Sequence, residues 1–127
     1  MKDYVKILEE AKAAGKKAFD ACVPVPVSWV QADLFGKQIG KPSEPDPEGE
    51  CGGAYITGIG GNSEFARWCK KNAPDMLRKG IYSGYFMYLS IDGYSGQSRE
   101  KRKAYAEAFA AALVEHGVQC RVKDYLT

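Results

Sequence analysis

The chain has 127 residues, of which 45% are hydrophobic and 27% are charged, and its net charge is +2. These values are typical of one globular domain, so we treat residues 1–127 as a single domain and exclude wholesale disorder. So small a net charge argues against strong nonspecific DNA binding. No apolar run is long enough to span a membrane, and residues 1–3 do not open a signal peptide. We therefore expect a cytoplasmic protein with no membrane partner.

The four cysteines, Cys22, Cys51, Cys69 and Cys120, show no CxxC or CxxH spacing. A structural zinc site needs such spacing, so we predict no metal and no other cofactor. In a cytoplasmic setting the thiols are expected to be free and mostly buried. A reactive thiol would need a base, and His116 is the one histidine of the chain.

The first segment predicts a helix over residues 3–22, because apolar residues recur there at steps of three and four. Asp3 is a suitable N-cap, and the run Val23-Pro24-Val25-Pro26 ends the helix. Residues 27–33, which include Trp29, predict a strand. Residues 34–50 predict a loop rich in proline, glycine and acidic side chains. This loop is either solvated and flexible or a holder for a divalent cation, although the EF-hand spacing is absent.

The middle of the chain predicts a strand over 54–59, a glycine-rich turn and a helix over 64–72 capped by Asn62 and Ser63. After a turn near Gly80, residues 81–91 predict a central strand that is rich in aromatic and branched side chains. Side chains alternate between the two faces of a strand. Phe86 and Tyr88 therefore share one face with Gly84, and the other face carries Tyr85, Met87, Leu89 and Ile91.

A second glycine turn, residues 92–97, precedes a helix predicted over 99–116 with Ser98 as its N-cap and Gly117 just past its end. Residues 118–122 predict the last strand. The order αββαβαβ indicates an α+β fold, a single domain in which helices pack on a four-stranded mixed sheet.

Both glycine turns would lie at one edge of the sheet if the strands before them run parallel, and α/β sheets commonly bind ligands at that edge. Backbone N–H groups of the first turn could then face an anion. Basic residues crowd the first turn of the last helix, where the helix dipole disfavours cations unless an anion binds. The expected ligand-binding residues are Gly60, Gly61, Asn62, Ser63, Tyr94, Ser98, Arg99, Arg102 and Lys103. The alternative is an ordinary capped turn with a solvated basic helix face.

Tyrosines near these basic residues suit single-stranded nucleic acid, a nucleotide base or a protein interface. The RNP signature of an RNA-recognition fold is absent from the strand at 81–91. Catalytic candidates are sparse: Asp33 and Asp92 end predicted strands, and His116 suits a helix C-terminus as a cation. No catalytic constellation is present, so the sequence favours binding over enzymatic activity.

Three stretches carry a family resemblance: CGGAYI at 51–56, GNSEFARWCKK at 61–71 and QSREKRKAYAEAFA at 97–110. They resemble a family of short, uncharacterised bacteriophage and prophage proteins. The resemblance implies a phage gene product in the host bacterial cytoplasm, and it supplies no catalytic residues. Our first hypothesis is a non-enzymatic binding protein for an anionic, phosphate-bearing ligand, a nucleotide or nucleic acid. The alternatives are a protein-interaction module for a host protein, including a homo-oligomer, and a small enzyme using Asp33, Asp92 or His116.

Overall fold

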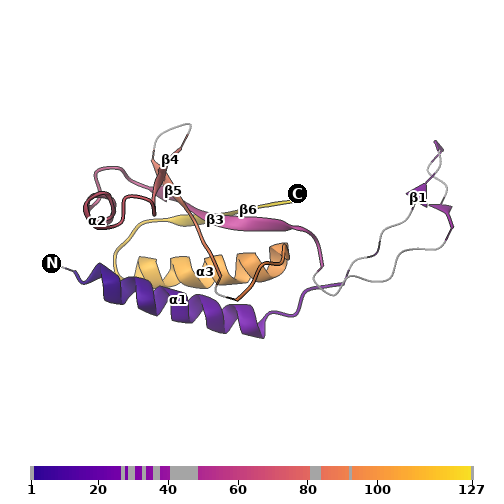
Figure 1. Cartoon of the computed structure of the whole chain (residues 1–127), viewed down its shortest axis with the longest axis horizontal. Helices are drawn as coiled ribbons and strands as arrows, with labels where there is room; N and C mark the ends of the chain where they lie inside the picture. Colours follow the sequence, from indigo (N-terminus) through magenta and orange to yellow (C-terminus); the bar gives the residue numbers. More distant parts are fainter. Residues whose placement is uncertain are drawn as a thin grey trace.

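The computed structural model describes residues 2–26, 28, 31–32, 34–35, 38–40, 49–80, 84–91 and 93–126. Three helices and six strands follow one another along these residues (Figure 1). Their bounds are α1 (Tyr4–Ala21), β1 (Gln31–Ala32), β2 (Gln38–Ile39), β3 (Gly52–Ile59), α2 (Glu64–Asn72), β4 (Arg78–Lys79), β5 (Tyr85–Tyr88), α3 (Arg99–Glu115) and β6 (Arg121–Leu126).

The three helices lie where the sequence predicts them, because each begins with a side-chain cap. Asp3, Ser63 and Ser98 accept a hydrogen bond from the backbone N–H three residues further on. These bonds satisfy N–H groups that have no partner inside the helix. Gly117 follows α3 with a φ of 84°, a left-handed conformation that glycine adopts without strain. The predicted caps Asp3, Ser63 and Ser98 are therefore confirmed, and Ser63 rather than Asn62 is the N-cap of α2.

The predicted four-stranded sheet is present, but its strands differ from those expected. Its order is β4-β5-β3-β6, and every neighbouring pair is antiparallel. The prediction of a mixed sheet is therefore wrong. Within the predicted strand at 27–33 the described residues form only β1, which pairs with β2 in a separate two-stranded sheet. The edge position goes instead to β4, two residues that the sequence indicated as a turn.

The connections explain how a sheet with two strand–helix–strand units remains antiparallel. Helix α2 links β3 to β4, which run in the same direction, and β5 lies between them. Helix α3 links β5 to β6 in the same way, with β3 between them. This is the split βαβ arrangement of ferredoxin-like folds. Helix α1 precedes it as an additional element.

Helices α1 and α3 lie side by side on one face of the sheet (Figure 1). Their contact is close at Gly15, where a Cβ atom would come within 2.9 Å of the Tyr105 ring. On the sheet, Ile56 and Ile59 are both fully buried although their odd spacing would place them on opposite faces. A bulge resolves this, because Gly58 has a φ of 76° and the β3–β5 register shifts between the two isoleucines.

On β3, β5 and β6, every second side chain points to the face of the sheet opposite α1 and α3.

None of the described helices combines the length and the apolar character that a membrane crossing requires.

Candidate functional site

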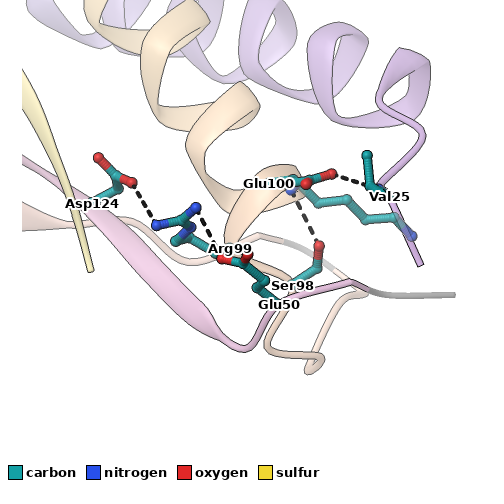
Figure 2. A network of polar contacts seen from close by, with 7 residues as sticks. Val25, Glu50, Ser98, Arg99, Glu100 and Asp124 are labelled. Atoms are coloured by element: carbon teal, nitrogen blue, oxygen red, sulfur yellow. Dashed lines mark hydrogen bonds and ion pairs between the residues drawn. The ribbon is translucent and has the colours of Figure 1, made fainter. Parts of the chain in front are cut away.

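The basic first turn of α3 lies in a network of internal contacts (Figure 2). The Arg99 guanidinium lies 3.0 Å from a Glu50 carboxylate oxygen and 3.6 Å from an Asp124 carboxylate oxygen. Glu100 accepts a hydrogen bond of 2.8 Å from the Val25 backbone N–H. Arg99 thus neutralises one carboxylate that precedes β3 and one from β6, and no local pattern in the sequence indicates either contact.

The neighbouring cations are also engaged. Arg102 donates to the Gly96 carbonyl oxygen from Nε at 3.0 Å and from a second guanidinium nitrogen at 2.6 Å. Its guanidinium carbon lies 5.1 Å from the centre of the Tyr94 ring, a cation–π contact. Lys103 lies 3.9 Å from Glu107 one turn along the helix. Arg102 and Tyr94 therefore hold the second glycine turn against α3.

The backbone donors at this helix end are occupied as well. Arg99 N–H donates to the Glu50 carbonyl at 2.9 Å, and Gly52 N–H donates to the Gln97 carbonyl at 2.8 Å. Ser98 N–H donates to the Tyr94 hydroxyl at 3.0 Å, while the fully buried Ser98 hydroxyl caps the helix. The turn at 93–98 is thus a junction that fixes the start of α3 to the start of β3.

Replacing Ser98 with Ala is expected to lower the free energy of unfolding by about 1 kcal/mol, because the Lys101 N–H loses its cap. Urea unfolding followed by circular dichroism measures the loss. Ser95→Ala is the matched control, since Ser95 is exposed in the same turn. Equal effects of the two substitutions would contradict the capping role.

The first glycine turn is a compact capped turn. Ser63 N–H donates to the Gly60 carbonyl at 3.1 Å, and the Ser63 hydroxyl donates to the same oxygen at 2.7 Å. The Lys70 ammonium donates to the Gly61 carbonyl at 3.2 Å and lies 4.7 Å from the centre of the Tyr85 ring. Asn62 is exposed beside them.

The structure does not bring the two glycine turns together. The turn at 60–63 follows β3, whereas the turn at 93–98 contacts the start of β3. An eight-residue strand spans roughly 26 Å. A common edge required β3 and β5 to be parallel, and they are antiparallel. The expected residues therefore form two separate groups: Gly60, Gly61, Asn62 and Ser63 at one end, and Tyr94, Ser98, Arg99, Arg102 and Lys103 at the other.

Of the catalytic candidates, Asp33 and Asp92 lie outside the described residues, as do Trp29 and loop residues 41–48. His116 is described, and its Nε2 lies 2.7 Å from the Glu10 carboxylate. This contact joins the end of α3 to α1. Burial raises the pKa of the Cys69 thiol to about 11, which keeps it protonated near neutral pH. Within the described residues, no three metal-ligating side chains gather.

The face of the sheet opposite α1 and α3 presents a cluster of aromatic rings, which we call the aromatic face. Its members are Tyr55, Phe86, Tyr88 and Tyr125. The centroid of the Tyr55 ring lies 5.9 Å from that of Phe86, 5.5 Å from that of Tyr88 and 6.2 Å from that of Tyr125. The ring centroids of Phe86 and Tyr88 are 5.2 Å apart. Tyr88 is 59% exposed and Tyr125 is 43% exposed, so the cluster is open to solvent.

Strand register builds the aromatic face. Tyr55 of β3 lies opposite Tyr88 of β5 on one side and Lys123 of β6 on the other. Residues that lie directly opposite in antiparallel strands share a face. The Tyr125 ring lies over Gly53, where a Cβ atom would come within 2.5 Å of the tyrosine hydroxyl. Glycine at this position leaves room for the hydroxyl end of the Tyr125 ring against the strand.

On the β6 side, two cations flank the aromatic face. Lys123 lies opposite Tyr55, and Arg121 lies opposite Thr57 one step along the same face. Both are exposed, and within the part of the chain that the structure describes neither forms an ion pair. The sequence signalled only part of this surface, through the alternation of Phe86 and Tyr88.

No protein family matches the chain. No curated protein matches it, and no solved structure matches it either. The case for a function therefore rests on the residues and geometry described above.

Proposed function

We propose that the protein binds single-stranded nucleic acid on the aromatic face and acts by binding rather than by catalysis. The observation that carries the proposal is the contiguous set of rings formed by Tyr55, Phe86 and Tyr88 on one open sheet face. Nucleic acid is one of the phosphate-bearing ligands that the sequence suggested. The site proposed for it is the sheet rather than the glycine turns.

Stacking chemistry supports this ligand. Every nucleic acid base has a π-face, so exposed aromatic rings bind successive bases with little dependence on sequence. Four-stranded antiparallel sheets with helices on the opposite face use such rings to bind single strands. A shared architecture does not by itself assign a function. The aromatic rings and the charges beside them support the proposal.

Charge supports the same ligand. Lys123 and Arg121 lie beside the rings, where their side chains can reach the phosphates of a strand stacked on Tyr55 and Tyr88. The basic residues at the start of α3 do not serve this purpose, because Arg99 and Arg102 are held by internal partners. The sequence resemblance implies a phage protein, which would encounter single-stranded nucleic acid in the host cytoplasm.

Salt dependence tests the proposal. The protein is titrated into a fluorescently labelled dodecathymidine or dodecauridine strand, and anisotropy is followed at several salt concentrations. The double variant Arg121→Gln/Lys123→Gln should bind more weakly and should lose about 0.7 from the slope of log K against log salt for each lost phosphate contact.

The matched control is Lys6→Gln/Lys17→Gln, which makes the same change of charge on the exposed surface of α1. It should retain the wild-type affinity. Absence of binding by the wild type at low salt, or an unchanged slope in the double variant, would refute the proposal.

A second candidate is a protein-interaction module, and the β1–β2 hairpin favours it. In the turn between these strands Leu34 is 100% exposed and Phe35 is 96% exposed. Large exposed apolar side chains that adjoin one another are characteristic of protein interfaces. This candidate predicts association with a host protein, or between copies of the chain, that is largely insensitive to salt. Sedimentation velocity at low and high salt would detect self-association.

A further inference from the structure

A groove lies on the helix side of the sheet, and Tyr88 of the aromatic face borders it at the end of β5. Its volume is about 980 Å³, within the range of small-molecule sites. Residues of α1 and α3 form one part of its lining, and residues at the end of β5 and around β4 form another. Helix α3 packs on β3 and β6, and α2 contributes only its last residue to the lining. The inner side of β5 borders the groove through Met87, which is 2% exposed.

The floor of the groove is apolar. Leu8 of α1, Met87 of β5 and Phe109 of α3 line it, and all three belong to the hydrophobic core. Each is almost fully buried, so the core itself forms the base of the groove. Such a floor favours a ligand with an apolar body.

The rim of the groove is cationic. Lys12 and Lys16 lie one turn apart on α1, and Arg78 contributes from β4. Asp75 is the single carboxylate among the described residues of the lining. Lys16 is paired with Asp20 at 3.0 Å. Among the residues that the structure describes, Lys12 and Arg78 have no acidic partner within ion-pair distance. Their charges are available to a ligand.

We propose that this groove binds a small amphipathic anion, with its apolar body on the core residues and its head group at Lys12 and Arg78. The apolar floor excludes a small inorganic ion as the preferred ligand, and the cationic rim disfavours neutral and cationic amphiphiles. The head group is a carboxylate or a phosphate, since both accept charge-assisted hydrogen bonds from lysine and arginine. Tyr88 borders both surfaces, and Arg78 lies opposite Phe86 of the aromatic face. The proposal does not depend on nucleic acid binding, because the floor residues Leu8, Met87 and Phe109 are not part of the aromatic face.

Isothermal titration calorimetry with octanoate, octyl phosphate and 2-naphthoate tests the proposal on the full chain. At least one of these anions should bind with a stoichiometry of one. Octanol and octyltrimethylammonium should bind at least tenfold more weakly. Comparison of octanoate with octyl phosphate distinguishes the two head groups.

Lys12→Gln and Arg78→Gln should each weaken binding of the best anion by roughly tenfold, the loss of one charge-assisted contact. Both residues are exposed, so the fold should be retained, and circular dichroism checks it. Lys123→Gln is the matched control and should bind the anion as the wild type does. The proposal is overturned if no anion binds, if neutral and anionic amphiphiles bind equally, or if all three variants bind equally.

Discussion

Replacing Tyr88 with Ala should weaken binding of a dodecathymidine or dodecauridine strand by about 1–3 kcal/mol, roughly five- to 150-fold. Tyr88 is the most exposed ring of the aromatic face, and it contacts both Tyr55 and Phe86. Its removal deletes one stacking surface and takes one adjoining ring from each of these two neighbours, which still contact each other. Fluorescence anisotropy at fixed low salt measures the change.

Tyr88→Phe separates stacking from hydrogen bonding, because it keeps the ring and removes the hydroxyl. It should bind within about twofold of the wild type, since stacking uses the face of the ring. Because the side chain is 59% exposed, neither substitution should unfold the protein. If Tyr88→Ala binds as tightly as the wild type while its circular dichroism is unchanged, the strand does not stack on this face.

The helices could be predicted from the sequence because their signals are local. An N-cap acts over three residues, and an apolar stripe repeats within one or two turns. Asp3, Ser63 and Ser98 consequently mark the three helix starts correctly. One buried residue of α1 is not marked by an apolar side chain: Gly15 is buried because it faces the Tyr105 ring. That detail depends on a neighbour ninety residues away in the chain.

Strand pairing could not be predicted in the same way, because it depends on partners that are distant in sequence. Strand β4 has only two residues and no periodic pattern, yet it forms the edge of the sheet. The last strand was predicted over 118–122 and is found over Arg121–Leu126. Val118 is buried before the strand begins. Its apolar character therefore reflects packing in the core rather than a place in the sheet.

The difference between local signals and contacts with distant residues also applies to the candidate anion site at the start of α3. The helix dipole disfavours the basic residues at the start of α3, and the sequence alone is compatible with either a bound anion or a solvated basic face. Glu50 and Asp124 supply the missing negative charge, from segments 49 and 25 residues away along the chain from Arg99. Basic residues in the first turn of a helix are compatible with a half-buried ion pair and equally with a bound phosphate, so the sequence alone does not distinguish the two.

Only part of the aromatic face could be predicted from the sequence, because the rest depends on strand pairing. Phe86 and Tyr88 alternate within one predicted strand, so their common face follows from local geometry. Tyr55 joins them only through the β3–β5 register, and Tyr125 lay beyond the predicted end of its strand. Once the register is known, three strands contribute rings to one surface.

Replacing Leu113 with Ala should lower the free energy of unfolding by about 2–5 kcal/mol, a large share of the 5–15 kcal/mol typical of such domains. Leu113 is fully buried in the hydrophobic core beneath the sheet. Truncation removes apolar contacts and leaves a cavity that a close-packed interior fills only in part. The Leu113 carbonyl still accepts the N–H groups of His116 and Val118, so the end of α3 keeps its hydrogen bonds.

Val114→Ala provides the matched control for this cavity. It removes aliphatic carbon from the next residue of the same helix, but Val114 is 54% exposed. Its effect should stay within about 0.5 kcal/mol, because an exposed methyl group loses little on truncation and alanine is the better helix former. Urea unfolding measures both variants. If their m-values equal that of the wild type, a shift of the midpoint reports a change in stability rather than a change in the unfolded state. Similar losses in the two variants would mean that α3 is not packed against the sheet through Leu113, and the support behind the aromatic face would have to come from other contacts.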